Sequence, residues 1–171
     1  MKIIEAMKKI KDLQRKAEDL REKIKNHSAD MDFETPIYEN QRQQVRDWIQ
    51  AHTDIVQEIM RLRVAIQRTN LATRIKVELG ETVVEKSVAE WVHRRRDLAQ
   101  LDLACWSAMT KDRLLKEGTV TQSNGEKREV KIRRYYDPAE RDKRTAVYAS
   151  EPTTIDATLE VANAVTELIE A

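Results

Sequence analysis

The sequence predicts a mainly helical fold with heptad-like apolar seams and one or two small β-hairpins. Of its 171 residues, 36% are charged and only 5% are aromatic, and Gly and Pro number 3 each. This composition is typical of long helices with solvated faces, and it disfavours sandwiches, barrels and disordered chains. The length permits one compact domain or an elongated bundle. We therefore expect a single helical domain over residues 1–171.

The first helix is predicted over about residues 2–26. Its apolar residues recur at alternating spacings of three and four, and Ile3, Ile10 and Ile24 mark the repeat. This spacing places them in one stripe on a helix, as in a coiled-coil seam. The segment that follows loses the rhythm and contains Pro36, so it is interpreted as a connection.

The second helix is predicted over about residues 41–73, where the same spacing resumes. We expect it to fold back on the first helix as an antiparallel hairpin. Its stripe is wider than a two-residue seam and needs more cover than one partner helix gives. The sequence therefore predicts a homo-oligomer. The residues that widen the stripe are Ile49, Val56 and Met60.

Period-two alternation predicts β structure at two places. Apolar and charged residues alternate over residues 75–84 around Gly80, which favours a small β element. A β-hairpin is predicted over about residues 119–136, because Asn124 and Gly125 tolerate the positive φ of a tight turn.

Two further helices are indicated by their start signals. Ser87 and Glu90 form a capping-box pattern that opens a helix over about residues 88–116. Asp137 and Pro138 suit the cap and the first turn of a last helix, over about residues 138–170. Pro152 should kink or break that last helix, because proline lacks the amide hydrogen that the helix needs.

An internal echo suggests a polar pocket between helices. Ile66–Thr73 resembles Leu159–Thr166, and each segment carries an Asn and a Thr three residues apart. On a helix such a pair shares one face and can offer an amide and a hydroxyl to the same neighbour. The alternative is that these groups cap helix ends or fix the register of the core. The four residues are Asn70, Thr73, Asn163 and Thr166.

A second candidate for ligand binding lies at the end of the predicted hairpin. In a strand, Arg133 and Tyr135 share one face, while Arg134 and Tyr136 share the other. Arginine binds phosphate through two hydrogen bonds and tyrosine stacks on a base, which suits a nucleotide-like ligand. Ion pairing with nearby acidic residues on the surface is the alternative.

Catalytic and metal chemistry are not indicated, and no cofactor is expected. The three glycines cannot build a phosphate-binding loop, and each has a turn role already. Glu90 and His93 have di-iron spacing, but no second such motif is present. Cys105 is the single cysteine and suggests a reducing cytoplasm. No stretch is long and apolar enough for a membrane span, so no membrane partner is expected.

Four short segments, together with the order of elements, carry a resemblance to a known family. They are Met1–Ala6, Ile66–Thr73, Arg133–Asp137 and Asn163–Leu168. In these the chain resembles the septicolysin-like proteins, small bacterial and phage-encoded helical proteins without an agreed biochemical function. The resemblance implies a helical hairpin, a third helix, a β-hairpin and a final helix, and it implies no catalytic residues.

The functional hypothesis is a non-catalytic, oligomeric binding protein that sequesters or senses a small anionic ligand of nucleotide-like chemistry, for example a phage-type signal-sequestering protein. The alternative is a structural or adaptor protein that acts only through protein–protein contacts. A nucleic-acid partner is disfavoured, because Lys and Arg together number 31 against 30 Asp and Glu.

Overall fold

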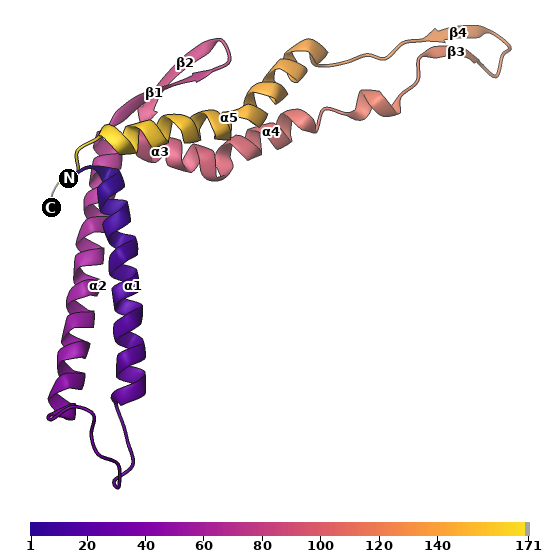
Figure 1. Ribbon diagram of the computed structural model, residues 1–171. Helices are drawn as coiled ribbons and strands as arrows, with labels where there is room; N and C mark the ends of the chain where they lie inside the picture. Colours follow the sequence, from indigo (N-terminus) through magenta and orange to yellow (C-terminus); the bar gives the residue numbers. More distant parts are fainter. Residues whose placement is uncertain (170–171) are drawn as a thin grey trace. The chain divides into compact units, whose positions relative to one another are not determined.

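The computed structural model describes residues 1–169 and is mainly helical, with two small β-hairpins (Figure 1). This confirms the predicted fold class. Where the sequence suggested a single domain, the chain divides into two compact units. The first comprises Met1–Arg74 together with the chain from Glu160 onward, and the second comprises Ile75–Leu159. Each unit has a hydrophobic cluster of its own.

The first unit is built on a hairpin of two helices, α1 (Ile3–His27) and α2 (Gln41–Ala72), which lie side by side (Figure 1). The predicted helical hairpin is thereby confirmed. At the start of α2, the Asn40 side chain accepts a hydrogen bond of 3.1 Å from the backbone N–H of Gln43, which satisfies an amide that the helix itself cannot pair.

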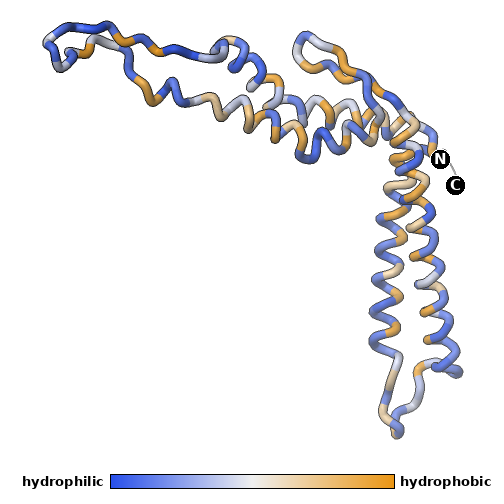
Figure 2. The backbone as a smooth tube through the Cα atoms, turned by 180° about the vertical axis from the view of Figure 1, so that it is seen from behind, coloured by the Kyte–Doolittle hydropathy of each residue, from blue (hydrophilic) through white to orange (hydrophobic). Residues whose placement is uncertain are grey.

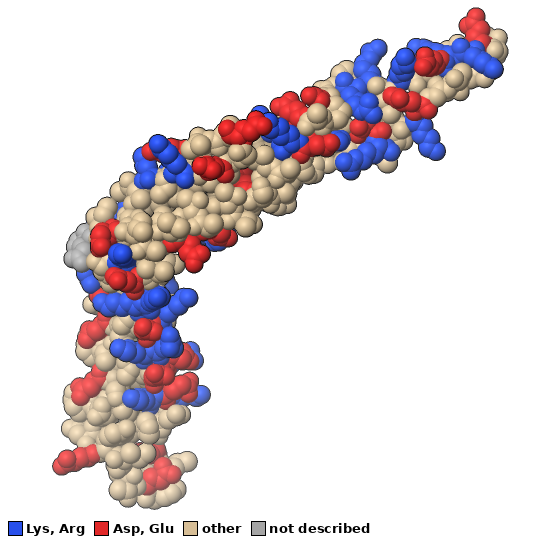
Figure 3. All heavy atoms as spheres, turned by 45° about the horizontal axis from the view of Figure 1, so that its top comes forward, with Lys and Arg blue, Asp and Glu red and all other residues tan. Residues whose placement is uncertain are grey.

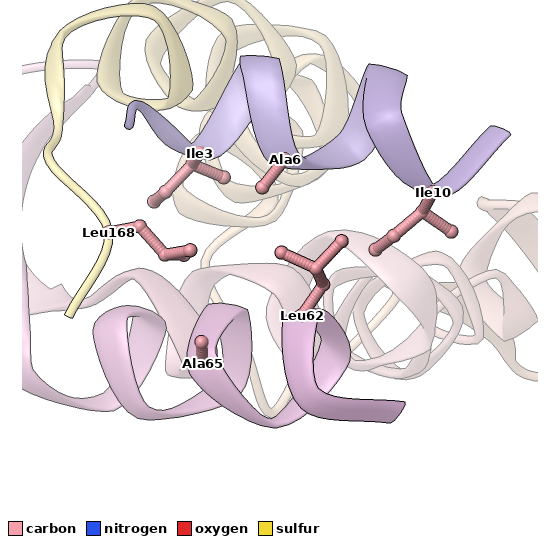
Figure 4. Packing of buried hydrophobic residues seen from close by; sticks show 6 residues of the cluster. All are labelled: Ile3, Ala6, Ile10, Leu62, Ala65 and Leu168. Carbon is pink, nitrogen blue, oxygen red and sulfur yellow. The ribbon is translucent and has the colours of Figure 1, made fainter. Parts of the chain in front are cut away.

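The core of the hairpin follows the predicted seam. Hydrophobic residues recur along both helices between hydrophilic ones (Figure 2), and those of the seam are buried or half-buried. Their side chains point toward one another (Figure 4), so they fill the space between the helices and the last described segment of the chain. The buried members are Ile3, Ala6, Ile10, Leu62, Ala65 and Leu168.

Aromatic rings close the hairpin at its loop end. His27 at the end of α1, Tyr38 in the connection and Trp48 on α2 pack against one another, with ring centroids 5.4–5.7 Å apart. The Gln41 side chain donates a hydrogen bond of 2.8 Å to the carbonyl of His27. Edge-to-face packing of this kind stabilises beyond the area it buries.

The second unit begins with a hairpin of β1 (Arg74–Leu79) and β2 (Thr82–Ser87). Gly80 takes the turn with φ 62°. A Cβ at this position would lie 3.1 Å from a methyl carbon of Val147 on the last helix, so glycine serves both the turn and the close approach.

A helical stretch follows and departs from the prediction. It consists of α3 (Val88–His93), a π-helical turn (Arg94–Leu98) and α4 (Ala99–Ser107), and a short 3₁₀ turn (Lys111–Leu114) comes after it. The predicted end near residue 116 is wrong, because the last residues bury nothing that would hold them in a helix.

The second β-hairpin, β3 (Gly118–Thr121) and β4 (Lys127–Val130), is antiparallel, and Gly118 lies opposite Val130. The hairpin was predicted, but its extension to residue 136 is wrong. Because β3 begins at Gly118, the chain beyond Val130 has no strand opposite it, and residues 131–134 are irregular.

The last helix, α5 (Pro138–Val165), runs through Pro152 without a break, although it changes direction along its length (Figure 1). It ends at Val165, because the chain at Glu167 forms a β-bridge with Lys2. The predicted end, residue 170, lies outside the described residues. Within residues 1–169, every helix is too short or too polar to cross a lipid bilayer.

The core of the second unit joins both ends of its chain. Residues of β1, α3 and α5 pack together, and the indole N–H of Trp91 donates a hydrogen bond of 3.2 Å to the carbonyl of Ile75. This core holds the first hairpin, α3 and α5 in fixed relation. Its buried members are Val77, Val88, Trp91, Ile155 and Leu159.

Candidate functional site

The four Asn and Thr residues predicted as ligand contacts all lie in the first unit. Thr73 follows α2, and its backbone N–H bonds the carbonyl of Thr69 at 2.9 Å. Thr166 follows α5, and its carbonyl accepts a hydrogen bond of 3.1 Å from the N–H of Ile3. Asn70 and Asn163 are half-buried, and the amide oxygen of Asn70 is buried without a hydrogen-bond partner in the described part of the chain. Backbone roles at helix ends therefore account for both threonines.

The four predicted residues of the hairpin end lie in the second unit and divide into two pairs. Arg134 donates a hydrogen bond of 3.0 Å to Asp112, and the Tyr136 hydroxyl donates one of 3.3 Å to a backbone carbonyl. Arg133 and Tyr135 are exposed, Tyr135 to 89%. A single pocket that combines these residues with Asn70 and its echo stays a prediction.

Arg134 and Tyr136 belong to a network around Arg141, which is only 8% exposed. The Arg141 guanidinium donates to the Met109 carbonyl at 2.9 Å and to the Tyr136 hydroxyl at 3.1 Å. Hydrogen bonding from Arg134 lowers the pKa of Asp112, and burial raises the pKa of Tyr136. The network thus ties the start of α5 and the residues before it to the chain around Met109 and Asp112, which is a structural role.

A groove with a volume of about 760 Å³ is the strongest candidate site. It lies within the second unit, between the first β-hairpin, α3 and the first half of α5. Its volume falls in the range of small-molecule sites. None of the eight residues predicted from sequence lines it. The lining residues used below are Glu81, Lys86, Trp91, Arg94, Lys143, Arg144, Tyr148 and Glu151.

A buried ion pair forms the floor of the groove. Arg94 donates hydrogen bonds of 2.6 and 2.9 Å to the two carboxylate oxygens of Glu151, whose side chain is 0% exposed. A third bond of 2.5 Å reaches Asp102. The hydrogen bonds that Arg94 donates to Glu151 are the main cause of the raised pKa of Arg94, so the guanidinium stays charged. Such a two-pronged pair fixes the guanidinium in one plane.

Two aromatic rings lie beside cations of the groove. The central guanidinium carbon of Arg94 is 5.4 Å from the ring centroid of Tyr148, and the ammonium of Lys86 is 5.9 Å from that of Trp91. Tyr148 is half-buried, while Trp91 is fully buried. Of the two rings, therefore, only that of Tyr148 can offer a face to a ligand.

The rim of the groove carries exposed ion pairs. Lys143 bonds Glu81 at 2.7 Å, and Arg144 lies 3.7 Å from Glu140. The hydrogen bond from Lys143 lowers the pKa of Glu81. Exposed pairs of this kind contribute little free energy, so an incoming anion can replace these carboxylates at small cost.

Sequence reasoning missed these groove residues for identifiable reasons. Arg94 lies in the run His93–Arg96, whose consecutive side chains point in different directions around a helix, so no spacing singles it out; of this run, Arg94 lines the groove. Lys143 and Tyr148 are more than one helical turn apart and belong to no distinctive motif. They become recognisable as groove residues only because α5 lies beside the first β-hairpin.

Metal binding finds no support in the described residues, where no three His, Cys, Asp or Glu side chains come close enough to hold an ion. The buried carboxylate of Glu151 is already occupied by Arg94. The groove is lined by cations and an aromatic ring, which suits binding of an anion.

Comparison with known proteins yields a likeness of fold. No family model matches the chain, and no curated protein matches it. A solved structure described as a functionally unknown conserved protein from Corynebacterium diphtheriae is similar, with a TM-score of 0.56 and 19% sequence identity over 99% of each chain. At this identity the likeness shows the fold alone, over nearly the whole chain.

Proposed function

We propose that the protein is a non-catalytic binding protein that sequesters or senses a small anionic ligand of nucleotide-like chemistry, held in the groove of the second unit. The observation that supports it is that Lys86, Lys143 and Arg144 line the same groove as the half-buried ring of Tyr148. Cations of this kind bind phosphate, and a tyrosine ring stacks on a base.

The fixed floor adds to this proposal. Because Arg94 is held by Glu151 and Asp102, its own positive charge is already balanced, and it serves to position the Tyr148 ring. Lys143 and Arg144 pair with exposed carboxylates, which a phosphate can displace. The groove therefore combines a rigid floor with an exchangeable rim.

Calorimetric titration tests the proposal with adenosine monophosphate, its cyclic form and nicotinamide adenine dinucleotide as probes. Lys143→Ala and Arg144→Ala should each weaken binding about tenfold, since a lost charge-assisted contact costs about 1.5 kcal/mol. Lys76→Ala, which removes an exposed cation from β1 outside the groove, is the matched control and should bind as the wild type does.

The residues predicted from sequence are tested in the same titration. Arg133→Ala and Asn70→Ala should weaken binding if these side chains contact the ligand, and they should leave it intact if the groove alone binds. The proposal fails if no probe binds, or if Lys143→Ala and Arg144→Ala both bind like the wild type.

The proposal includes self-association and a cytoplasmic location. Ile49, Val56 and Met60 on α2 are 50%, 47% and 63% exposed, and a second chain would cover them. The single cysteine, Cys105, is exposed and free, which suits a reducing compartment.

The same apolar stripe supports a second candidate function, that of a structural or adaptor protein with protein partners only. An exposed seam on a long helix is a common surface for another helix. Native mass spectrometry of the purified protein separates the two functions, because an adaptor would carry no phosphate-bearing compound.

A further inference from the structure

Two exposed surfaces of the chain carry opposite charges. The acidic loop, residues 28–40 between α1 and α2, contains four acidic residues and no Lys or Arg. The basic arm, residues 118–134 with β3 and β4, contains five Lys or Arg and two Glu, a net charge of +3. Figure 3 shows red and tan atoms at the loop end of the hairpin, and blue atoms gathered along the arm.

Most of these charges have no opposite charge beside them. In the described residues, Asp30, Asp32 and Glu39 of the acidic loop have no Lys or Arg within ion-pair distance. In the same described residues, three cations of the basic arm have no Asp or Glu within ion-pair distance. Lys131 and Arg134, by contrast, each pair with a carboxylate. Three acids and three cations are thus available. The cations are Lys127, Arg128 and Arg133.

Both surfaces also expose apolar side chains. In the acidic loop, Met31, Phe33 and Ile37 are 62%, 82% and 72% exposed. In the basic arm, Val120 is 54% exposed, and no residue of β3 or β4 is buried. A two-stranded hairpin without cover on either face is marginally stable in water, so the arm gains stability from a partner.

We infer that the acidic loop of one copy of the chain docks on the basic arm of a second copy. Charge complementarity selects this occupant, because arm against arm would oppose like charges and so would loop against loop. Residues 31–34 form a turn, closed by a hydrogen bond of 2.9 Å from the N–H of Glu34 to the carbonyl of Met31. The turn brings exposed apolar and acidic residues together on one short segment. In a two-fold dimer the contact occurs twice.

Charge reversal tests the contact by sedimentation equilibrium of the full chain. One variant carries Asp30→Lys, Asp32→Lys and Glu39→Lys, and the other carries Lys127→Glu, Arg128→Glu and Arg133→Glu. Each should weaken self-association at least about tenfold, and both sets in one chain should restore it, because six ion pairs per dimer are first lost and then rebuilt with reversed signs. Circular dichroism checks that every variant remains helical.

Cross-linking of an equal mixture of ¹⁴N and ¹⁵N chains gives a second measurement. A carbodiimide should join carboxylates of the acidic loop to Lys127 or Lys131, in peptides with one light and one heavy half. Same-isotope peptides only, or no rescue in the combined variant, would overturn the inference. The inference would also be overturned if charge reversal in the basic arm abolished binding to a nucleic-acid oligomer and left self-association unchanged. Nucleotide titration of the groove is independent of all these outcomes.

Discussion

At the scale of single residues, the second unit contains a buried ion pair, at a depth where a charge without a partner is strongly unfavourable. Glu151 is 1% exposed, and an isolated carboxylate at such a depth would lose its hydration without compensation. The two hydrogen bonds from Arg94 compensate for that loss. A buried pair of this kind adds little net stability, but replacing one of its two residues strongly destabilises the fold.

The first prediction follows from that asymmetry. Glu151→Ala should lower the free energy of unfolding by about 3 to 5 kcal/mol, because it leaves Arg94 without its main partner. Urea denaturation followed by circular dichroism measures the change. Glu81→Ala, which breaks an exposed pair, should change it by less than about 1 kcal/mol. Equal effects of the two substitutions would show that the floor of the groove is not a buried ion pair.

A second residue-scale prediction concerns pH. Hydrogen bonds from Arg61 and then from Lys9 lower the pKa of Glu58 from 4.5 to about 2. A lowered pKa contributes stability at pH values above 4.5, and this contribution is lost as the pH falls toward 2. Denaturation curves should therefore show Glu58→Gln less stable than the wild type at pH 7, with the difference shrinking between pH 4.5 and 2. A difference independent of pH would contradict this.

At the scale of elements, the helices owe their bounds to packing more than to propensity. The predicted third helix continues to residue 116, yet α4 ends at Ser107, since Lys111–Leu114 bury no side chain. The predicted long strand ends at Val130 because its partner begins at Gly118. Neither the end of α4 nor the end of β4 can be predicted from the local sequence, because each depends on the segment that packs against or pairs with it.

The third prediction compares the two β-hairpins. Amides of β3 and β4 should exchange with deuterium faster than those of β1 and β2, since the arm is fully exposed while Val77 of β1 is buried in the core of its unit. Exchange read by mass spectrometry at low protein concentration, where copies dissociate, is the suitable measurement. Equal protection at that concentration would show that the arm is stable by itself.

At the scale of the whole chain, periodicity predicted more than motifs did. The spacing of Ile3, Ile10 and Leu62 gave the hairpin and its core, because burial on one helix face leaves a regular trace in sequence. The groove left no such trace. Its residues come from three separate segments, and a charged residue such as Lys143 has the same appearance in sequence whether it lines a groove or faces open water.

The fourth prediction tests self-association through α2. Ile49→Lys with Val56→Lys should shift the chain toward monomer in light-scattering chromatography, because two exposed apolar positions of one face become charged. Gln50→Lys with Gln57→Lys adds the same charge at exposed positions with no loss of apolar area. Each lies one residue after a tested position, about 100° around the helix, so this pair is the matched control. A wild type that is monomeric across micromolar concentrations would refute the prediction.

The π-helical turn of the second unit determines which residues share a helix face. On a regular α-helix, Arg94 and Asp102 are eight positions apart and differ in direction by about 80°, at about 100° per residue. The π-turn at Arg94–Leu98 accommodates one extra residue, so the pair acts as if seven apart and is out of line by only about 20°. The extra residue thus places a second carboxylate under the Arg94 guanidinium, at 2.5 Å. Deletion of one residue there, such as Arg96, would leave a regular helix and rotate Asp102 away from its cation.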